Sequence, residues 1–215
     1  MAERGEGGDR LYSPSAGRNA DAIAAAWGAL LPPSGRVVEV ACGTGEHAMR
    51  LCAAFPGLDW QLSDPDPASR ASADDWAREV PGGRMAPALD LDVTVPGWWS
   101  AMPSPDVIYC ANMIHIAPWA AAEGLLRGAA ALLTDDEPGP EPGEGTLALY
   151  GPFSRRGAMA PSNRSFDASL KARDPGWGVR DLDDDVQPLA ARFGLALTHV
   201  REMPANNLFV LFEPN

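Results

Sequence analysis

The sequence predicts an α/β fold in which helices cover a mostly parallel sheet. Three observations support this prediction: apolar runs of strand length alternate with helical patterns, most of these runs are nearly continuous, and the chain closes on a hairpin-like pair. Nearly continuous apolar runs are typical of strands that are buried on both faces, as in parallel sheets wrapped by helices. Right-handed crossovers are then expected between successive strands.

The predicted elements follow one another in a regular order. A first helix enters through Asn19 and stops at the proline pair 32–33. Strands are predicted at 35–41, 58–63, 86–93, 105–111 and 145–151. Helices are predicted between them at 45–55, 67–80 and 118–133. Residues 195–214 hold two strand-like runs around a Pro-Ala-Asn-Asn turn, which predicts an antiparallel hairpin.

Length and composition indicate one ordinary domain. The 215 residues are 46% apolar and 21% charged, close to the average of globular proteins. We expect a flexible tail at 1–10 and a single domain at 11–215. The acidic, Pro/Gly-rich stretch 134–145 is interpreted as a solvated connection within that domain.

The charge balance disfavours two classes of partner. Lys and Arg number 17 against 29 Asp and Glu, a formal charge of -12, which repels nucleic acid and anionic membrane surfaces. The N-terminus has no apolar signal core, and the longest apolar stretch, 22–31, is too short to span a membrane. The three cysteines lack metal-type spacing, so no metal site is predicted. Together with the N-terminus, they predict a reduced, cytoplasmic protein. The negative charge favours a small or cationic partner.

The stretch 37–48 predicts a binding turn. Gly43 and Gly45 let a strand turn sharply into a helix whose first N–H groups favour a carboxylate or phosphate. A phosphate-binding loop is excluded because its lysine is missing, but Gly43, Gly45 and Ala48 also fit the dinucleotide pattern of nicotinamide enzymes. Glu39, an acid inside the strand, favours a cationic ligand instead.

The run from Glu39 to Gly45 resembles motif I of class I methyltransferases that use S-adenosylmethionine. The resemblance implies that Asp64, closing the next strand, holds the ribose hydroxyls of this cofactor. It also implies an adenine contact by Asp92, preferred over Asp90 because it directly precedes Val93 and the expected loop. The implied cofactor residues in these three regions are Glu39, Ala41, Gly43, Thr44, Gly45, Asp64, Pro65, Asp92 and Val93.

Several further strings narrow the resemblance. The stretches 12–19, 63–67, 112–119, 150–153, 166–181 and 202–208 are similar to a methyltransferase-like family of unknown function found in bacteria and animals. The similarity covers nearly the whole chain after residue 10 and implies a Rossmann-like sheet of seven strands in the order 3-2-1-4-5-7-6, with the last strand antiparallel. The departures are the loop 134–145 and Cys42, where Ser is more usual.

The loop after the fourth strand of the sheet is expected to face the transferred methyl group, because ligands bind beyond the carboxyl ends of parallel strands. Asn112, His115 and Trp119 lie in this loop. His115 is the candidate general base at the mouth of the cleft. Asn112 is the candidate for orienting a ligand amide or the methionine part of the cofactor. The alternative is that His115 caps the next helix or packs on Trp119.

Other polar and aromatic residues complete the predicted site. Arg18 and Asn19, expected before the first helix, are assigned to the cofactor, and Tyr12 beside them to the substrate. His47, Tyr150 and Asn206 are further substrate candidates. For His47 a structural or cofactor-adjacent role is favoured over substrate contact, and an asparagine in a turn needs no function.

The sequence therefore predicts an S-adenosylmethionine-dependent methyltransferase that leaves S-adenosylhomocysteine and acts on a small molecule or small peptide. A non-catalytic cofactor-binding partner protein, other chemistry with the same cofactor and a nicotinamide oxidoreductase remain as alternatives. The sequence gives no prediction of the oligomeric state or of the acceptor atom.

Overall fold

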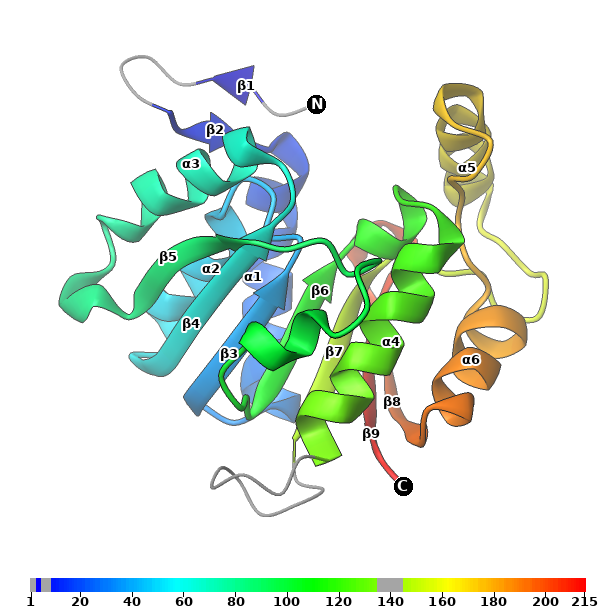
Figure 1. Ribbon diagram of the computed structural model, residues 1–215. Helices are drawn as coiled ribbons and strands as arrows, with labels where there is room; N and C mark the ends of the chain where they lie inside the picture. The colour runs from blue at the N-terminus through cyan, green and yellow to red at the C-terminus, as the bar shows by residue number, and fades with distance from the viewer. Residues whose placement is uncertain (1–2, 5–8, 135–144) are drawn as a thin grey trace. The chain divides into compact units, whose positions relative to one another are not determined.

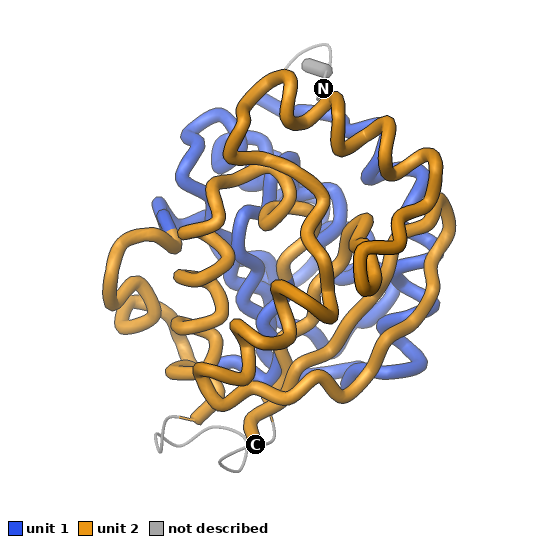
Figure 2. The backbone as a smooth tube through the Cα atoms, turned by 90° about the vertical axis from the view of Figure 1, so that its right-hand side faces the viewer, with its two compact units in different colours: residues 1–92, 105–109 blue, residues 93–104, 110–215 orange. Residues whose placement is uncertain are grey.

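The computed structural model describes residues 3–4, 9–134 and 145–215 (Figure 1). The predicted connection 134–145, apart from its two end residues, and positions 1–2 and 5–8 of the predicted tail lie outside the described residues. The chain divides into two compact units (Figure 2). One holds the residues up to 92 together with 105–109, and the other holds 93–104 and 110–215.

The first unit carries the parallel strands. Strand β3 pairs in parallel with β4 and with β6, and β4 pairs in parallel with β5. Three helices accompany these strands, with α1 packed on α2 and α3 packed on β4 and β5. The bounds are α1 Pro14–Leu30, β3 Ser34–Val40, α2 Glu46–Ala54, β4 Gly57–Asp64, α3 Pro67–Ala77, β5 Met85–Asp90 and β6 Val107–Ala111, whose last two residues belong to the second unit.

An aromatic cluster centres the core of the first unit. The rings of Trp27, Trp60 and Tyr109 lie 5.6 to 6.0 Å apart, and all three side chains are fully buried. They come from α1, β4 and β6, so the cluster ties a helix to two strands of the sheet. Burial of such large rings contributes several kcal/mol, on the order of 2 kcal/mol each.

The second unit is antiparallel. Strand β9 pairs antiparallel with both β7 and β8, and the predicted hairpin is the β8–β9 pair. On α4, Gly128 admits the Trp98 ring, whose Nε1 donates to the Gly124 carbonyl at 3.0 Å, and Gly124 admits the backbone of Val93. The bounds are α4 Trp119–Thr134, β7 Thr146–Gly151, α5 Pro161–Arg173, α6 Gln187–Arg192, β8 Leu195–Met203 and β9 Asn207–Pro214.

The seven strands follow the order β5-β4-β3-β6-β7-β9-β8 in the sheet. Counting only these seven strands along the chain, this is 3-2-1-4-5-7-6, so the predicted order is confirmed. The final strand is antiparallel to both of its neighbours, as predicted.

The predicted start of the first helix is wrong, because the predicted entry at Asn19 lies six residues after the observed N-cap, Ser13. Helix α1 begins at Pro14, with Ser13 as its N-cap accepting the Ala16 N–H at 3.3 Å. A Ser-Pro pair is a typical N-cap and first helical residue, and Gly17, inside the helix, masks this signal. Arg18 and Asn19 consequently lie within α1 rather than before it.

Helix α5 has no counterpart among the predicted elements. Only Asn163 and Leu170 of its thirteen residues are buried. An apolar periodicity arises from a buried face, so a helix that buries two residues gives too weak a pattern to find.

Both described parts of the predicted tail, 3–4 and 9–10, contact other parts of the first unit. Glu3–Arg4 form strand β1, which pairs antiparallel with β2, Leu11–Tyr12. The Arg10 guanidinium contacts Asp75 at 3.1 Å and also binds Glu79. No helix in the described residues is long and apolar enough to cross a membrane, and the three cysteines are buried free thiols.

Ala41, directly after β3, has a left-handed backbone with φ of 56°. This conformation costs a residue with a Cβ about 1–2 kcal/mol, whereas glycine adopts it freely but loses more entropy on folding. We therefore expect Ala41→Gly to leave stability unchanged or raise it by up to about 1 kcal/mol, measured by urea unfolding. Ala25→Gly, at an exposed site inside α1, is the matched control and should destabilise by about 1 kcal/mol. Equal losses in both variants would contradict the strain at Ala41.

Candidate functional site

The turn 41–46 joins β3 to α2 in the first unit. Its two glycines, Gly43 and Gly45, have different surroundings. Gly43 and Gly45 have φ values of 55° and 84°. A Cβ on Gly45 would lie 2.6 Å from the Ala73 Cα of α3, so only glycine permits this approach of turn and helix. A Cβ on Gly43 would meet no heavy atom within 4 Å. The turn is therefore closed on the Gly45 side and open on the Gly43 side.

Glu39 places a carboxyl group inside the sheet, on β3. The residue is 1% exposed, and its Oε2 has no hydrogen-bond partner among the described residues. Burial, and then the charge of Asp64, raise the pKa of Glu39 well above that of an ordinary carboxyl group. A buried carboxyl group with a free oxygen is costly, and a cation beside it would offset that cost.

Asp64 closes β4 next to the turn. Its Oδ2 accepts the Gly43 N–H and its Oδ1 accepts the Asp66 N–H, both at 2.9 Å. Burial raises the pKa of Asp64, and these two N–H groups oppose the rise. The bonds fix the orientation of the carboxylate, while each oxygen keeps a lone pair for a further donor.

Glu39 and Asp64 are brought together by the backbone of two neighbouring strands. The Ser63 hydroxyl donates to the Glu39 carbonyl at 2.8 Å, and the Cys42 N–H donates to the Ser63 carbonyl at 2.9 Å. The structure therefore gathers five of the residues that the sequence assigned to the cofactor, namely Glu39, Gly43, Thr44, Gly45 and Asp64.

Sequence reasoning missed two polar residues at this turn. Glu46 accepts the Thr44 hydroxyl at 3.0 Å, and the Ser72 hydroxyl donates to the Thr44 carbonyl at 2.8 Å. Both side chains are buried. An acid at the first position of a helix is a usual signal of the helix start and gives no sign of this contact, and Ser72 gives no signal of its own.

Of the other assigned cofactor residues, Ala41 begins the turn and Pro65 follows Asp64, whereas Val93 and Asn112 belong to the second unit. Arg18 is exposed and Asn19 half-buried on α1, and Asp92 is exposed two residues beyond the end of β5. Asp90, the rejected alternative, ends β5 and pairs with Arg70 at 3.1 Å. The roles of Arg18, Asn19, Ala41, Pro65, Asp92, Val93 and Asn112 stay predictions.

The sequence predicts His115 at the open mouth of a cleft, but the structure does not show it there. Its side chain is completely buried in the second unit, against the Phe153 ring at 4.8 Å. Burial first, and then the Arg180 charge, lower the pKa of His115 to about 3, against a weak opposing effect of the Gly178 N–H. The ring is therefore neutral at physiological pH.

The tautomer of His115 follows from its hydrogen bonds. Its Nδ1 accepts the Arg180 N–H at 3.3 Å, and its carbonyl accepts the Gly178 N–H at 2.9 Å. Because a backbone N–H can only donate, the ring proton resides on Nε2, which has no partner among the described residues. His115 thus anchors the loop 176–180 and presents a donor rather than a base.

Arg180 strengthens the same anchor. Its guanidinium donates to the Ile114 and Ala117 carbonyls at 2.9 and 3.0 Å and lies over the Trp119 ring at 5.4 Å. Trp119, an assigned acceptor-side residue, is therefore half-buried beneath a cation. Burial lowers the pKa of Arg180.

Three of the remaining substrate candidates have structural contacts, and the fourth, Tyr150, is buried. The Asn206 amide donates to the Ser162 hydroxyl at 2.9 Å, and burial raises the pKa of Tyr150 to about 12. In the first unit, the Nδ1 of His47 lies 3.5 Å from the Tyr109 hydroxyl, and burial lowers the pKa of His47 to about 4. The Tyr12 ring meets Trp76 edge-on at 5.3 Å. Their assignment to a substrate stays a prediction.

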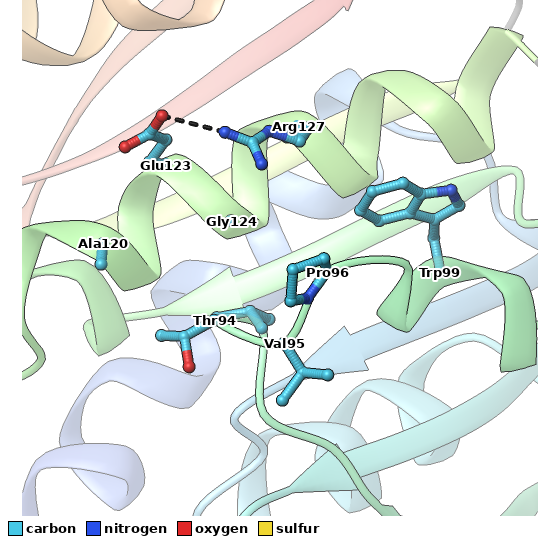
Figure 3. Close-up of a pocket in the computed structure, with 9 residues that line it drawn as sticks. Thr94, Val95, Pro96, Trp99, Ala120, Glu123, Gly124 and Arg127 are labelled. Carbon is cyan, nitrogen blue, oxygen red and sulfur yellow. Dashed lines mark hydrogen bonds and ion pairs between the residues drawn. The ribbon is translucent and has the colours of Figure 1, made fainter.

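A shallow pocket lies in the second unit between the segment 93–99 and α4 (Figure 3). Its volume is about 130 Å³, and its rim carries the Glu123–Arg127 ion pair at 3.0 Å. Pockets for drug-sized ligands measure roughly 300–1,000 Å³, so this one is too small for such an acceptor. Of the assigned residues only Val93 lines it. No cluster of metal-ligating side chains occurs within 3–4, 9–134 and 145–215.

Comparison with known proteins identifies the family. The model of the family described as "Protein of unknown function (DUF938)" matches residues 10–214. The chain belongs to the DUF938 family.

Solved structures show which fold this DUF938 chain shares. It is similar to the mitomycin 7-O-methyltransferase MmcR, with 18% identity, a TM-score of 0.75, and coverage of 94% of this chain and 54% of that one. The calicheamicin-biosynthesis methyltransferase CalO1, bound to S-adenosylhomocysteine, matches with 20% identity, a TM-score of 0.71 and coverage of 94% and 54%.

A third structure is NcsB1, an O-methyltransferase from neocarzinostatin biosynthesis in complex with S-adenosylmethionine and 2-hydroxy-5-methyl naphthoic acid. It matches with 19% identity, a TM-score of 0.72 and coverage of 94% and 55%. The DUF938 chain therefore has the class I methyltransferase fold, and it spans about half the length of these structures.

The buried, neutral His115 gives this DUF938 protein a pH-dependent stability. The unfolded chain binds a proton at this histidine below pH 6.5, whereas the folded chain does so only near pH 3, so stability falls as the pH falls between these values. Between pH 6.5 and 5 the wild type should lose about 2 kcal/mol more than His115→Gln, measured by urea unfolding. The exposed His199→Gln is the matched control. Parallel pH profiles of the wild type and His115→Gln would contradict the burial of a neutral ring.

Proposed function

We propose that this protein is an S-adenosylmethionine-dependent methyltransferase that acts on a small molecule or a small peptide. The observation that carries the proposal is Glu39, a fully buried carboxyl group whose Oε2 is without a partner among the described residues, on the strand that leads into the Gly43 turn and within electrostatic range of Asp64. A ligand with a cationic group would satisfy this oxygen. The class I methyltransferase fold supports the same proposal.

The residues of the first unit fit the cofactor. Glu39 suits its ammonium group, and Asp64, with lone pairs left on both oxygens, suits the ribose hydroxyls. The first-turn N–H groups of α2 suit its carboxylate, because they have no partners within the helix. When bound, the cofactor supplies a methyl group on a positively charged sulfur. The residues of this chain bind and orient the reactants.

The same residues disfavour a dinucleotide. Glu39, Glu46 and Asp64 place three buried carboxyl groups around the turn. A nicotinamide cofactor would bring a diphosphate to this position, and like charges at short range repel strongly where water is excluded. These three carboxyl groups therefore support S-adenosylmethionine over a nicotinamide cofactor at this turn.

Asn112, His115 and Trp119 are proposed for the acceptor side. Two neighbours support a small acceptor: NcsB1 was solved with a naphthoic acid, and an O-methyltransferase family 2 protein from Planctomyces limnophilus with apigenin. The formal charge of -12 argues against nucleic acid. A cytoplasmic location fits the free, buried thiols.

Asp64→Asn tests the cofactor site directly. The variant keeps an acceptor for the Gly43 N–H but loses the charge offered to a diol, so affinity for S-adenosylhomocysteine should fall about tenfold or more, measured by titration calorimetry. Asp66→Asn, two residues on, is the control, because asparagine is an equally good N-cap for α3 and the site is exposed. Binding of NADH in place of S-adenosylhomocysteine would overturn the proposal.

Glu39→Gln separates binding from stability. Glutamine removes the buried charge and its repulsion from Asp64, so the variant should be at least as stable as the wild type. Because the folded-state pKa of Glu39 is raised, the wild type loses stability as the pH rises through that pKa, and the advantage of the variant should grow from pH 5 to pH 8.

The same variant should bind S-adenosylhomocysteine about tenfold more weakly, since the ligand ammonium loses a charged partner. Thermal unfolding at the two pH values and calorimetric binding provide the readouts. A destabilised variant with unchanged affinity would show that Glu39 serves the fold alone. Binding without methyl transfer to any member of an acceptor panel would instead favour the non-catalytic alternative.

A further inference from the structure

Glu46 and Ser72 hold the same residue, Thr44, from two sides. The Glu46 carboxylate accepts the Thr44 hydroxyl at 3.0 Å, and the Ser72 hydroxyl donates to the Thr44 carbonyl at 2.8 Å. Glu46 begins α2 and is 6% exposed, and Ser72 lies within α3 and is 0% exposed. The middle residue between the two glycines is therefore fixed by groups from two helices.

The same two groups also bind residues 11–13, the N-terminal segment. The Ser13 N–H donates to the Glu46 carboxylate at 2.5 Å, to the same Oε2 that accepts Thr44. The Leu11 N–H donates to the Ser72 hydroxyl at 2.8 Å. Each group thus bridges the N-terminal segment and the turn through a single oxygen atom.

The N-terminal segment has its own anchors on α3. The Trp76 Nε1 donates to the Leu11 carbonyl at 3.2 Å, and the Arg10 guanidinium lies 4.2 Å from the centre of the Trp76 ring. Helix α3 is also the helix that Gly45 approaches at Ala73. One helix therefore supports both the segment and the turn, and the two cannot rearrange independently.

We propose that Glu46 and Ser72 are positioning residues that couple the order of residues 11–13 to ligand binding at the glycine turn, an inference that rests on the proposed cofactor. Neither side chain has to touch the ligand, because each acts through Thr44. Coupling of this kind is reciprocal. If the ordered segment favours binding, then binding orders the segment to the same extent.

Ser72→Ala is the first test. It removes one oxygen atom, and alanine is the better helix former, so α3 is retained. In the unliganded protein, amide hydrogen exchange at residues 11 and 43–45 should become faster. Affinity for S-adenosylhomocysteine should fall about tenfold, because two part-buried hydrogen bonds are lost, one to the turn and one to the N-terminal segment. Ser169→Ala, on the exposed face of α5, is the matched control and should change neither quantity.

Glu46→Gln is the second test, since glutamine keeps one oxygen acceptor but not the charge. Because Glu46 and Ser72 act on one residue, the double variant should lose less affinity than the product of the two single losses. In the wild type, S-adenosylhomocysteine should slow the exchange of the Leu11 and Ser13 amides, and in Ser72→Ala this protection should be lost. A role confined to fold stability would leave the ligand-dependent protection in place.

The outcomes separate this inference from the proposed function. If S-adenosylhomocysteine does not bind the wild type, the proposed function fails. Amide exchange in the unliganded protein then still decides whether residues 11–13 and the glycine turn are coupled to each other. If it binds the wild type and Ser72→Ala equally, or if Ser72→Ala leaves exchange at 43–45 unchanged, the coupling is overturned.

Discussion

The constraint on which the site depends is a carboxyl group inside a parallel sheet. Glu39 lies between Leu62 of β4 and Tyr109 of β6 in the strand register, and its position excludes water. An apolar residue of similar size would stabilise the sheet better, because a buried carboxyl group with a free oxygen is costly. The Glu39 carboxyl group is therefore a cost to folding, and this cost is the reason why we propose a cationic ligand here.

The turn after β3 connects Glu39 to other parts of the first unit, namely Asp64 and α3. Gly45 brings α3 within contact of the turn, and Asp66, at the start of α3, donates its N–H to Asp64. The carboxylate proposed for the ribose is therefore oriented by the same helix that supports residues 11–13. The carboxylate, the turn and the N-terminal segment form one hydrogen-bonded system, so their geometry has a common origin in α3.

Sequence patterns predicted the elements that have a local apolar periodicity. They missed the residues whose hydrogen-bond partners lie far along the chain. The strands and the hairpin were found because their buried faces give continuous apolar runs, whereas α5 buries only Asn163 and Leu170 and gives none. Glu39 was found because an acid inside an apolar strand is unusual, and Asp64 because the resemblance to class I methyltransferases implies an acid at the end of the next strand. The bonds of Glu46 to Ser13 and of Ser72 to Leu11 span 33 and 61 positions, and no local pattern predicts a partner so far along the chain.

His115 shows how such a distant contact changes the chemistry assigned to a residue. Its position after β6 suggested a base, but the loop 176–180 occupies its Nδ1, and the charge of Arg180 lies nearby. To accept a proton, the ring would have to give up the Arg180 N–H and place a second positive charge beside the guanidinium in a buried setting, and both steps are unfavourable. The geometry therefore argues against proton removal by this histidine.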